Sequence, residues 1–191
     1  MGRPKLLLPW GKTSVIGHLI EQWRNLGAAQ IAVVCAARDQ GMQTELDRLG
    51  FPGENRPLNP EPERGMFSSI QRAARWPGWA AALTHWAIVL GDQPHLLLST
   101  LQAVLEFSAT HPNKICLPRH GRHRRHPVLL PRLAFTQLAN SPAADLKAFL
   151  GTMGSELAFC ELDDPGLDLD IDQPEDYEHA LRMAQDPESR P

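Results

Sequence analysis

The residues best suited to chemistry follow a short apolar run near the middle of the chain. Ala87 to Leu90 is aliphatic, and Gly91-Asp92-Gln93-Pro94 follows it directly. Such a run is typical of a strand buried on both faces, and glycine, aspartate and proline end the strand and turn the chain. In open α/β sheets, ligands bind beyond the carboxyl ends of the strands. Asp92 is therefore placed to hold a hard cation such as Mg²⁺; the alternative is that it only forms the turn.

A second group of carboxylates lies near the end of the chain. Asp168, Asp170 and Asp172 alternate with aliphatic residues, so in an extended segment they point to one side. Clustered carboxylates repel one another, and a divalent cation relieves that repulsion. The alternative is that Asp172 is the N-cap of the final helix, with Glu175 completing a capping box. We expect Asp172 to cap, which makes Asp170 the better metal ligand.

Basic and hydroxyl side chains suggest sites for phosphate. Arg3 and Lys5 precede an apolar run, where a basic pair neutralises a polyphosphate and a departing pyrophosphate; the alternative is two solvated charges. Gly65 with Ser68 and Ser69 has the pattern of a helix start, where free backbone N–H groups attract anions. The alternative there is that the serines only cap the helix.

A segment rich in arginine and histidine spans His120 to Pro127. The spacing of its three histidines suits a helix face, but its glycine and proline favour a loop. Since no cysteine or acid adjoins it to complete a Zn²⁺ shell, we reject a metal site. Arg125 and His126 are candidates for contact with an anionic substrate, and the alternative is a solvated loop.

An α/β framework must position these residues. Hydrophobic periodicity predicts helices over 15–26, 42–49, 65–76, 97–109, 133–139, 145–150 and 173–184, and strands over 30–35, 87–90, 115–117, 127–130 and 156–161. Strands that alternate with helices predict a mostly parallel sheet flanked by helices. We expect one domain over 1–184 and a disordered tail over 185–191.

Composition narrows the class of protein. The 191 residues carry a net charge of −3, whereas general nucleic-acid binders are basic. The apolar stretches are too short to span a membrane, and the start does not have the pattern of a signal peptide. Cys35, Cys116 and Cys160 lie in apolar runs and are predicted to be buried, unpaired thiols, which fits a reducing cytoplasm.

Taken in order, these segments resemble the MobA-like nucleotidyltransferases, and within them the molybdenum cofactor cytidylyltransferase branch. The matching segments are Met1 to Pro9, Asn59-Pro60 with Gly65 to Ser69, Gly91 to Pro94, His126 to Val128, and Asp170 to Asp176. The similarity runs through nearly the whole chain. Its most specific parts are Gly-Asp-Gln-Pro and the acidic motif that follows it at a distance.

The resemblance implies a Rossmann-like sheet of the nucleotide-diphospho-sugar transferase type and a nucleotidyl transfer. CMP passes from CTP to a molybdopterin-type acceptor, the molybdenum cofactor, and pyrophosphate leaves. Asp92 is then the Mg²⁺ ligand, with Asp170 and Asp172 near the metal, and Lys5 and Asp92 are the catalytic residues. The remaining implied contacts are Arg3, Lys5, Ser68, Ser69 and Gly91 to the nucleotide, and Arg125 and His126 to the acceptor.

Two other functions remain open. One is a catalytically silent relative that binds the cofactor or delivers it to a molybdoenzyme, for which the xanthine dehydrogenase family is the implied partner. The other is a nucleotidyltransferase that acts on a sugar phosphate.

The chain also departs from the family pattern. The family's first strand and glycine-rich loop have no counterpart ahead of Met1, so either the start codon is assigned too far downstream or the copy is truncated. Without that strand, the neighbouring strands expose unpaired backbone edges. Arg125 replaces the usual glycine before His-Pro, and residues 141–147 replace another family segment.

Overall fold

The computed structural model describes residues 4–185 as helices packed around short sheets. The helices are α1 (Val15–Asn25), α2 (Gln40–Arg48), α3 (Met66–Arg75), α4 (Leu98–Thr110), α5 (Arg132–Ala139), α6 (Leu146–Thr152) and α7 (Pro174–Gln185). The strands are β1 (Pro9–Trp10), β2 (Thr13–Ser14), β3 (Cys35–Ala36), β4 (Leu58–Asn59), β5 (His85–Ile88), β6 (Ile115–His120), β7 (His123–Arg124), β8 (Val128–Pro131) and β9 (Leu157–Glu161). The 3₁₀ turns are η1 (Lys5–Leu7), η2 (Gly53–Asn55), η3 (Pro62–Arg64), η4 (Gly154–Glu156) and η5 (Pro165–Asp168).

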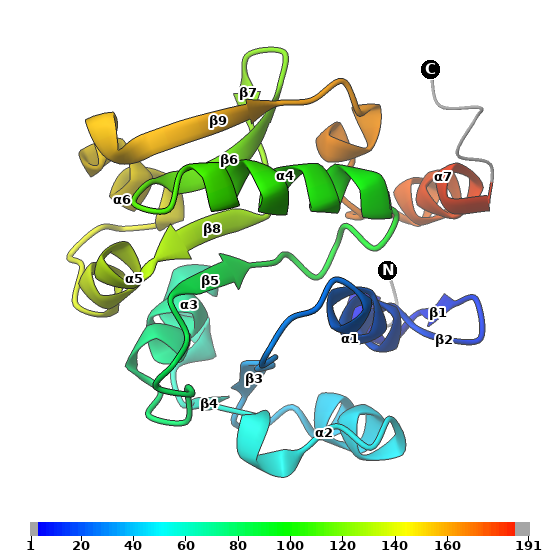
Figure 1. Cartoon of the computed structure of the whole chain (residues 1–191). Helices are drawn as coiled ribbons and strands as arrows, with labels where there is room; N and C mark the ends of the chain where they lie inside the picture. The colour runs from blue at the N-terminus through cyan, green and yellow to red at the C-terminus, as the bar shows by residue number, and fades with distance from the viewer. Residues whose placement is uncertain (1–3, 186–191) are drawn as a thin grey trace.

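The main sheet contains β5, β8, β6, β7 and β9 (Figure 1). β8 lies between β5 and β6 and is antiparallel to both, whereas β9 is parallel to β6. The predicted α/β class is confirmed, but the sheet is mixed rather than mostly parallel. The reason is that β6, β7 and β8 follow one another through very short connections, which join only antiparallel strands.

Alternating side chains give this sheet two apolar faces. Ile115, Leu117 and Leu130 pack with α3, α5 and α6. Cys116 and Leu129 point to the opposite face and pack against Val104 of α4. Because successive strand residues face opposite sides, strands of this composition are covered by helices on both faces. Figure 1 shows α4 lying across one of these faces.

The first part of the chain forms a smaller layer beside this sheet. The side chain of Ser14 caps α1 by accepting a hydrogen bond from Gly17 N, and Asp39 caps α2 through Met42 N. Residues 33–37 run parallel to residues 55–59, with Val33 N donating to Asn55 O at 3.0 Å.

Most helices lie within a few residues of their predicted ranges, but two strands differ. The strand predicted over 30–35 is paired as a strand only at Cys35–Ala36, and the strand predicted over 87–90 ends at Ile88. Both runs have one edge without a strand partner among residues 4–185. A strand is maintained by its pairing, so these apolar runs become irregular where the pairing stops.

Two further observations concern the whole described range. Of the predicted tail over 185–191, Gln185 ends α7 and the other residues lie outside the described part of the chain. Among residues 4–185 there is also no helix with the length and apolar character needed to cross a bilayer.

We predict that Leu138→Ala lowers the free energy of unfolding by about 2–5 kcal/mol, because it removes buried methyl groups from a filled core. Leu138 is fully buried in α5. Leu133 of the same helix is 71% exposed, and Leu133→Ala is the matched control, with an expected change within about 0.5 kcal/mol. Urea unfolding of both variants measures the difference. Equal effects would contradict the assignment of the buried face of α5.

Candidate functional site

One ammonium group joins three distant segments of the chain. Lys5 Nζ in η1 lies 3.2 Å from Asp92 Oδ2, in the turn after β5, and 2.9 Å from Asp172 Oδ1, just before α7. The three side chains are partly exposed, so the cluster is open to ligands. The structure therefore brings together three of the residues singled out from the sequence.

Backbone and amide contacts hold the acidic segment against the turn after β5. Ile171 N donates to Asp92 O at 3.1 Å, and Gln93 Nε2 donates to Asp170 Oδ1 at 2.9 Å. Ile171 is buried, whereas Asp168, Asp170 and Asp172 are exposed, as the alternating pattern predicts. Asp170 thus lies beside Asp92, and the amide of Gln93 orients its carboxylate.

The electrostatics of this cluster suit a cation. Burial and the negative charge of Asp92 raise the pKa of the Asp170 carboxyl group. Burial lowers the pKa of Lys5, but the hydrogen bond to Asp172 and the charge of Asp92 outweigh it, and the pKa is raised. Asp92 Oδ1 is buried without a hydrogen-bond partner in the described part of the chain. A carboxylate oxygen left in this state is one that a metal ion would satisfy.

The protein's own ligand set is small. Residues 4–185 contain no group of three or more histidine, cysteine, aspartate or glutamate side chains arranged to hold a metal. Asp92 and Asp170 are the carboxylates that fit a cation here, because Asp92 Oδ1 has no partner among the described residues and Asp170 lies beside it. Such a site suits Mg²⁺, which usually keeps several waters and binds one or two carboxylates together with substrate phosphates.

The predicted capping role of Asp172 is wrong. α7 begins at Pro174, so its third position is Asp176. Asp176 Oδ2 accepts hydrogen bonds from the backbone N–H groups of Asp172 and Gln173, at 3.0 and 2.7 Å. Because the helix starts later than predicted, Asp176 takes the place expected for Glu175, and the Asp172 side chain is left for Lys5.

Ser68 and Ser69 lie inside α3 and are not its N-cap, contrary to the alternative considered from the sequence. Gly65, with φ of 83°, is the N-cap of α3 and provides no side-chain hydrogen bond. Asn59 Nδ2 instead donates to Ser68 Oγ at 2.8 Å and to Ser69 Oγ at 3.0 Å. Asn59 itself is buried. The sequence did not single out this asparagine, although it lies in a segment that carries the family resemblance.

Gly91 lies close to the same cluster. A Cβ atom at this position would lie 2.4 Å from Leu6 Cδ2, so a larger residue requires the Leu6 side chain to move. Leu6 and Gly91 line one groove together with Ser69. Arg3, the remaining predicted nucleotide contact, lies outside the described residues.

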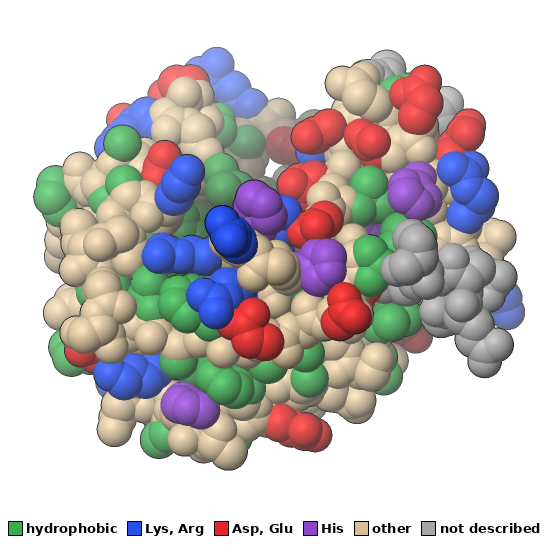
Figure 2. Space-filling view, turned by 90° about the horizontal axis from the view of Figure 1, so that it is seen from above, with side chains coloured by type: hydrophobic (Ala, Val, Ile, Leu, Met, Phe, Trp, Pro, Cys, Tyr) green, Lys and Arg blue, Asp and Glu red, His purple; other side chains and the backbone are tan. Residues whose placement is uncertain are grey.

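Arg125 is bound to a carboxylate of its own chain. Its Nε donates to Asp168 Oδ1 at 2.7 Å, while His120 Nδ1 lies 2.9 Å from Asp168 Oδ2. Burial opposes the charge on Asp168, but these two partners outweigh it and lower the pKa of the carboxyl group. Figure 2 shows basic, acidic and histidine side chains intermixed on this face of the molecule.

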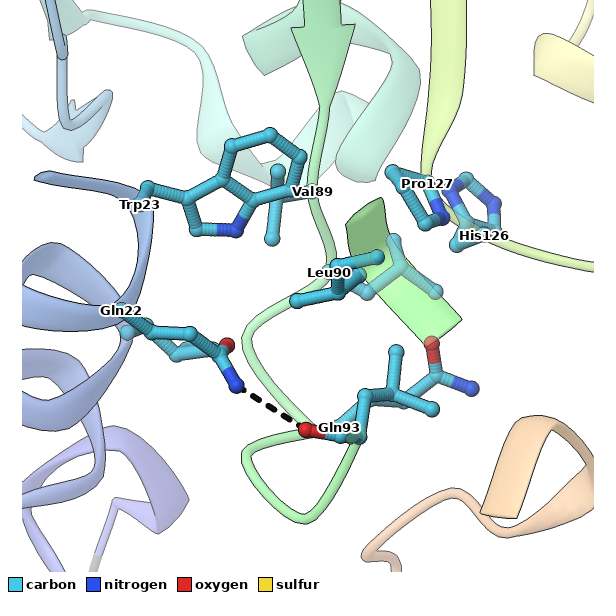
Figure 3. A pocket seen from close by; sticks show the side chains of 10 residues that line it. Gln22, Trp23, Val89, Leu90, Gln93, His126 and Pro127 are labelled. Atoms are coloured by element: carbon cyan, nitrogen blue, oxygen red, sulfur yellow. Dashed lines mark hydrogen bonds between the residues drawn. The ribbon is translucent and has the colours of Figure 1, made fainter. Parts of the chain in front are cut away.

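His126 is in a different environment from Arg125. Burial lowers its pKa, so the imidazole is neutral at pH 7, and its Nδ1 lies 3.4 Å from Ile88 O. His126 therefore presents a neutral ring rather than a positive charge. Together with Pro127, Trp23 and Val89 it lines a cavity of about 10 Å³ (Figure 3), which is far too small for a nucleotide.

Comparison with known proteins identifies a family and a fold. The family model described as "MobA-like NTP transferase domain" matches residues 1–157. None of the curated proteins matches the chain.

Solved structures share the fold over nearly the whole chain. Rv0371c from Mycobacterium tuberculosis H37Rv has a TM-score of 0.75 and 24% identity, over 95% of this chain and 90% of that one. A second structure of that protein, in complex with manganese, has a TM-score of 0.68 and 24% identity, over 95% of this chain and 93% of that one.

Two further neighbours bear names that mention molybdopterin or CTP. The molybdopterin-guanine dinucleotide biosynthesis protein A from Archaeoglobus fulgidus has a TM-score of 0.64 and 14% identity, covering 96% of this chain and 92% of that one. CMP:2-keto-3-deoxy-manno-octonic acid synthetase, complexed with CTP, has a TM-score of 0.70 and 13% identity, covering 95% of this chain and 92% of that one. At these identities the likeness establishes the fold, and it confirms the predicted nucleotide-diphospho-sugar transferase type.

We predict that the His120 pKa lies above its ordinary value of about 6.5 and falls in Asp168→Asn. The hydrogen bond from His120 to Asp168 raises this pKa more than burial lowers it. Because the folded-state pKa is the higher one, the pair stabilises the fold below pH 6.5 and loses this contribution as the pH rises through the folded-state pKa. An NMR titration of His120 measures the shift.

Asp163→Asn is the matched control for that titration. Asp163 lies 3.6 Å from His120 Nε2 and its side chain is fully exposed, so this substitution should change the His120 pKa less. A larger effect from Asp163→Asn than from Asp168→Asn would contradict the assigned pairing.

Proposed function

Because this chain belongs to the MobA-like NTP transferase family and is a nucleotidyltransferase, we propose that it transfers CMP from CTP to molybdenum cofactor. An oxygen of the acceptor's phosphate attacks the α-phosphorus of the nucleotide. The bond to the β-phosphate breaks, and pyrophosphate leaves. The protein's main tasks in such a reaction are to position two anions and to offset their charge.

The observation that carries the proposal is the state of Asp92. One of its carboxylate oxygens pairs with Lys5, while the other is buried without a partner among the described residues. A buried oxygen in this state costs stability unless a ligand satisfies it.

Asp92 and Asp170 are the residues that would hold Mg²⁺. Burial and the neighbouring charge of Asp92 raise the pKa of Asp170, and that charge favours a cation between the two carboxylates. When bound, the metal neutralises charge on the triphosphate and on the departing pyrophosphate. The manganese complex of the mycobacterial neighbour is consistent with a divalent ion in this fold.

Lys5 supplies the second positive charge of the site. Asp92 and Asp172 hold its ammonium group in place, and the hydrogen bond to Asp172 keeps it protonated. A fixed ammonium group stabilises negative charge that develops on phosphate oxygens, without the cost of reorganising water. We propose that Ser69, Gly91 and the start of α3 lie along the nucleotide beside it, because Ser69 and Gly91 line one groove.

The base and the acceptor are chosen from the family resemblance and from two structural neighbours. CTP is chosen because the sequence motifs resemble the cytidylyltransferase branch and because one structural neighbour was solved with CTP. A molybdopterin acceptor follows from the same resemblance and from the name of the Archaeoglobus neighbour. Arg125 and His126 are the proposed acceptor contacts, and a molybdoenzyme that receives the product is the implied partner.

The direct test is release of pyrophosphate from CTP, GTP and ATP in the presence of molybdenum-loaded cofactor and Mg²⁺. We expect release with CTP to be fastest. Asp92→Asn should lower the rate by at least about a hundredfold, because it removes one charge from the metal site. Asp47→Asn, at an exposed aspartate of α2, is the matched control and should leave the rate unchanged.

The outcomes separate the possibilities. An active Asp92→Asn variant would show that Asp92 only forms a turn and does not bind the metal. Release only with a sugar phosphate as acceptor would overturn the molybdopterin assignment and retain the enzyme class. No release with any nucleotide or acceptor would contradict the proposed reaction.

Metal binding provides a second prediction. We expect Asp170→Asn to weaken Mg²⁺ binding by about tenfold or more, since even the loss of an outer-shell partner costs about 10–100-fold. Because the pKa of Asp170 is raised, the wild-type affinity should fall on acidification at a higher pH than for an ordinary aspartate. Calorimetry across pH measures both effects. An affinity independent of Asp170 would show that this residue does not bind the metal.

A further inference from the structure

The small cavity described above lies between α1 and the turn after β5 (Figure 3). Its volume is about 10 Å³, which is close to the space that one water molecule needs and excludes any organic ligand. In Figure 3 the side chains of Gln22 and Trp23 extend from α1 toward the run that contains Val89 and Leu90. Most of the lining is aliphatic, so any polar atom in it is conspicuous.

Three side chains of this lining carry a buried polar atom that has no hydrogen-bond partner among residues 4–185. The atoms are Gln22 Oε1, Trp23 Nε1 and Gln93 Oε1. The residues themselves are 8%, 8% and 4% exposed. A buried polar atom without a partner is unfavourable, and in folded proteins such atoms are satisfied by the chain or by ordered water. Their presence around one cavity indicates that the cavity holds a hydrogen-bonding ligand.

The other bonds of the two glutamines fix the chemistry of these atoms. Gln22 Nε2 donates to Leu96 O at 2.9 Å, and Gln93 Nε2 donates to Asp170 Oδ1 at 2.9 Å. Because both partners are oxygen acceptors, each amide group must present its nitrogen to them and keep its oxygen for another partner. The indole nitrogen of Trp23 can only donate. The lining therefore offers one donor and two acceptors.

This combination selects the ligand. The N–H group of Trp23 repels a cation, and the two amide oxygens repel an anion. No aspartate, glutamate, lysine or arginine of the described chain lines the cavity, and burial lowers the pKa of His126, so its ring is neutral at pH 7. An apolar ligand would leave all three polar atoms unsatisfied. Water both accepts and donates hydrogen bonds, and it has the right size.

We propose that this cavity binds one water molecule, which accepts a hydrogen bond from Trp23 Nε1 and donates to Gln22 Oε1 and Gln93 Oε1. Three hydrogen bonds are typical of a buried water. The water joins α1 to the turn that carries Asp92. It also fixes the far end of the amide group that orients Asp170. The proposal does not depend on the reaction proposed above, because it concerns only the packing of α1 against the turn.

Nuclear Overhauser measurements between water and protein protons of the 191-residue chain test the proposal. We expect a cross peak between the indole proton of Trp23 and a long-lived water. Trp23→Phe identifies this signal among those of the five tryptophans, and comparison of laboratory-frame and rotating-frame effects separates it from proton exchange. A high-resolution crystal structure should show a density peak about 2.7–3.2 Å from each of the three atoms.

A matched pair of glutamine variants locates the water. Gln22→Met keeps the length of the side chain and removes the acceptor, so the cross peak between Trp23 and water should be lost. Gln71 is also buried, and its Nε2 also donates to a backbone carbonyl, that of Ser141, at 2.8 Å. Because Gln71 does not line the cavity, Gln71→Met should leave the cross peak unchanged. Circular dichroism confirms that each variant is folded.

Three results would overturn the proposal. The first is a wild-type chain with neither the cross peak nor the density peak. The second is a cross peak that persists in folded Gln22→Met, because the water would then be held by other groups. The third is a density peak with contacts of about 2.0–2.6 Å, which are typical of a metal ion. The first and third results need no variant, so a Gln22→Met chain that does not fold leaves the proposal open to refutation.

Discussion

Repulsion between carboxylates is the constraint on which the candidate site depends. Asp92, Asp170 and Asp172 come from two separate loops, and their mutual repulsion opposes the contact between those loops. The ammonium group of Lys5 pairs with two of these carboxylates, and the Ile171–Asp92 backbone hydrogen bond fixes the spacing of the loops. The start of the described chain, the turn after β5 and the segment before α7 are held together in this way. Lys5 offsets one of the three negative charges, and the proposed divalent cation would offset the other two.

The main sheet makes this arrangement possible because its packing against helices involves its two faces and not the ends of its strands. Its apolar residues pack against helices on both faces. The loops after the strands are not part of this packing and can hold polar residues. β5 ends at Ile88, where its partner β8 begins at Val128. Beyond that point the chain is positioned by tertiary contacts with Leu6 and Ile171 rather than by strand pairing.

Sequence reasoning was most successful where the cause was local. The apolar periodicity of α1 and α4 predicts both helices closely, and the end of an aliphatic run predicts the turn that contains Asp92. The start of α7 differs from the prediction because aspartate is a favoured N-cap residue, whereas the Asp172 side chain pairs with Lys5, which is distant in sequence. Gln93 and Asn59 were missed as positioning residues because their partners, Asp170 and the two serines, become visible only in three dimensions. The strand predicted over 30–35 is paired only at Cys35–Ala36 for the same reason, since a strand requires a hydrogen-bonded neighbour and the sequence does not show which segment that is.

The pairing of Arg125 with Asp168 has a consequence for the proposed contact between Arg125 and an anionic acceptor. Its guanidinium group is already neutralised by a carboxylate of the same chain, and His120 shares that carboxylate. An incoming anion does not meet a vacant positive charge; it must exchange with an internal one. A singly charged carboxylate gains little from such an exchange, whereas a dianionic phosphate offers more charge and more acceptor oxygens than the group it displaces. For the proposed acceptor contact at Arg125, Asp168 would thus be an internal competitor that the acceptor's phosphate must displace.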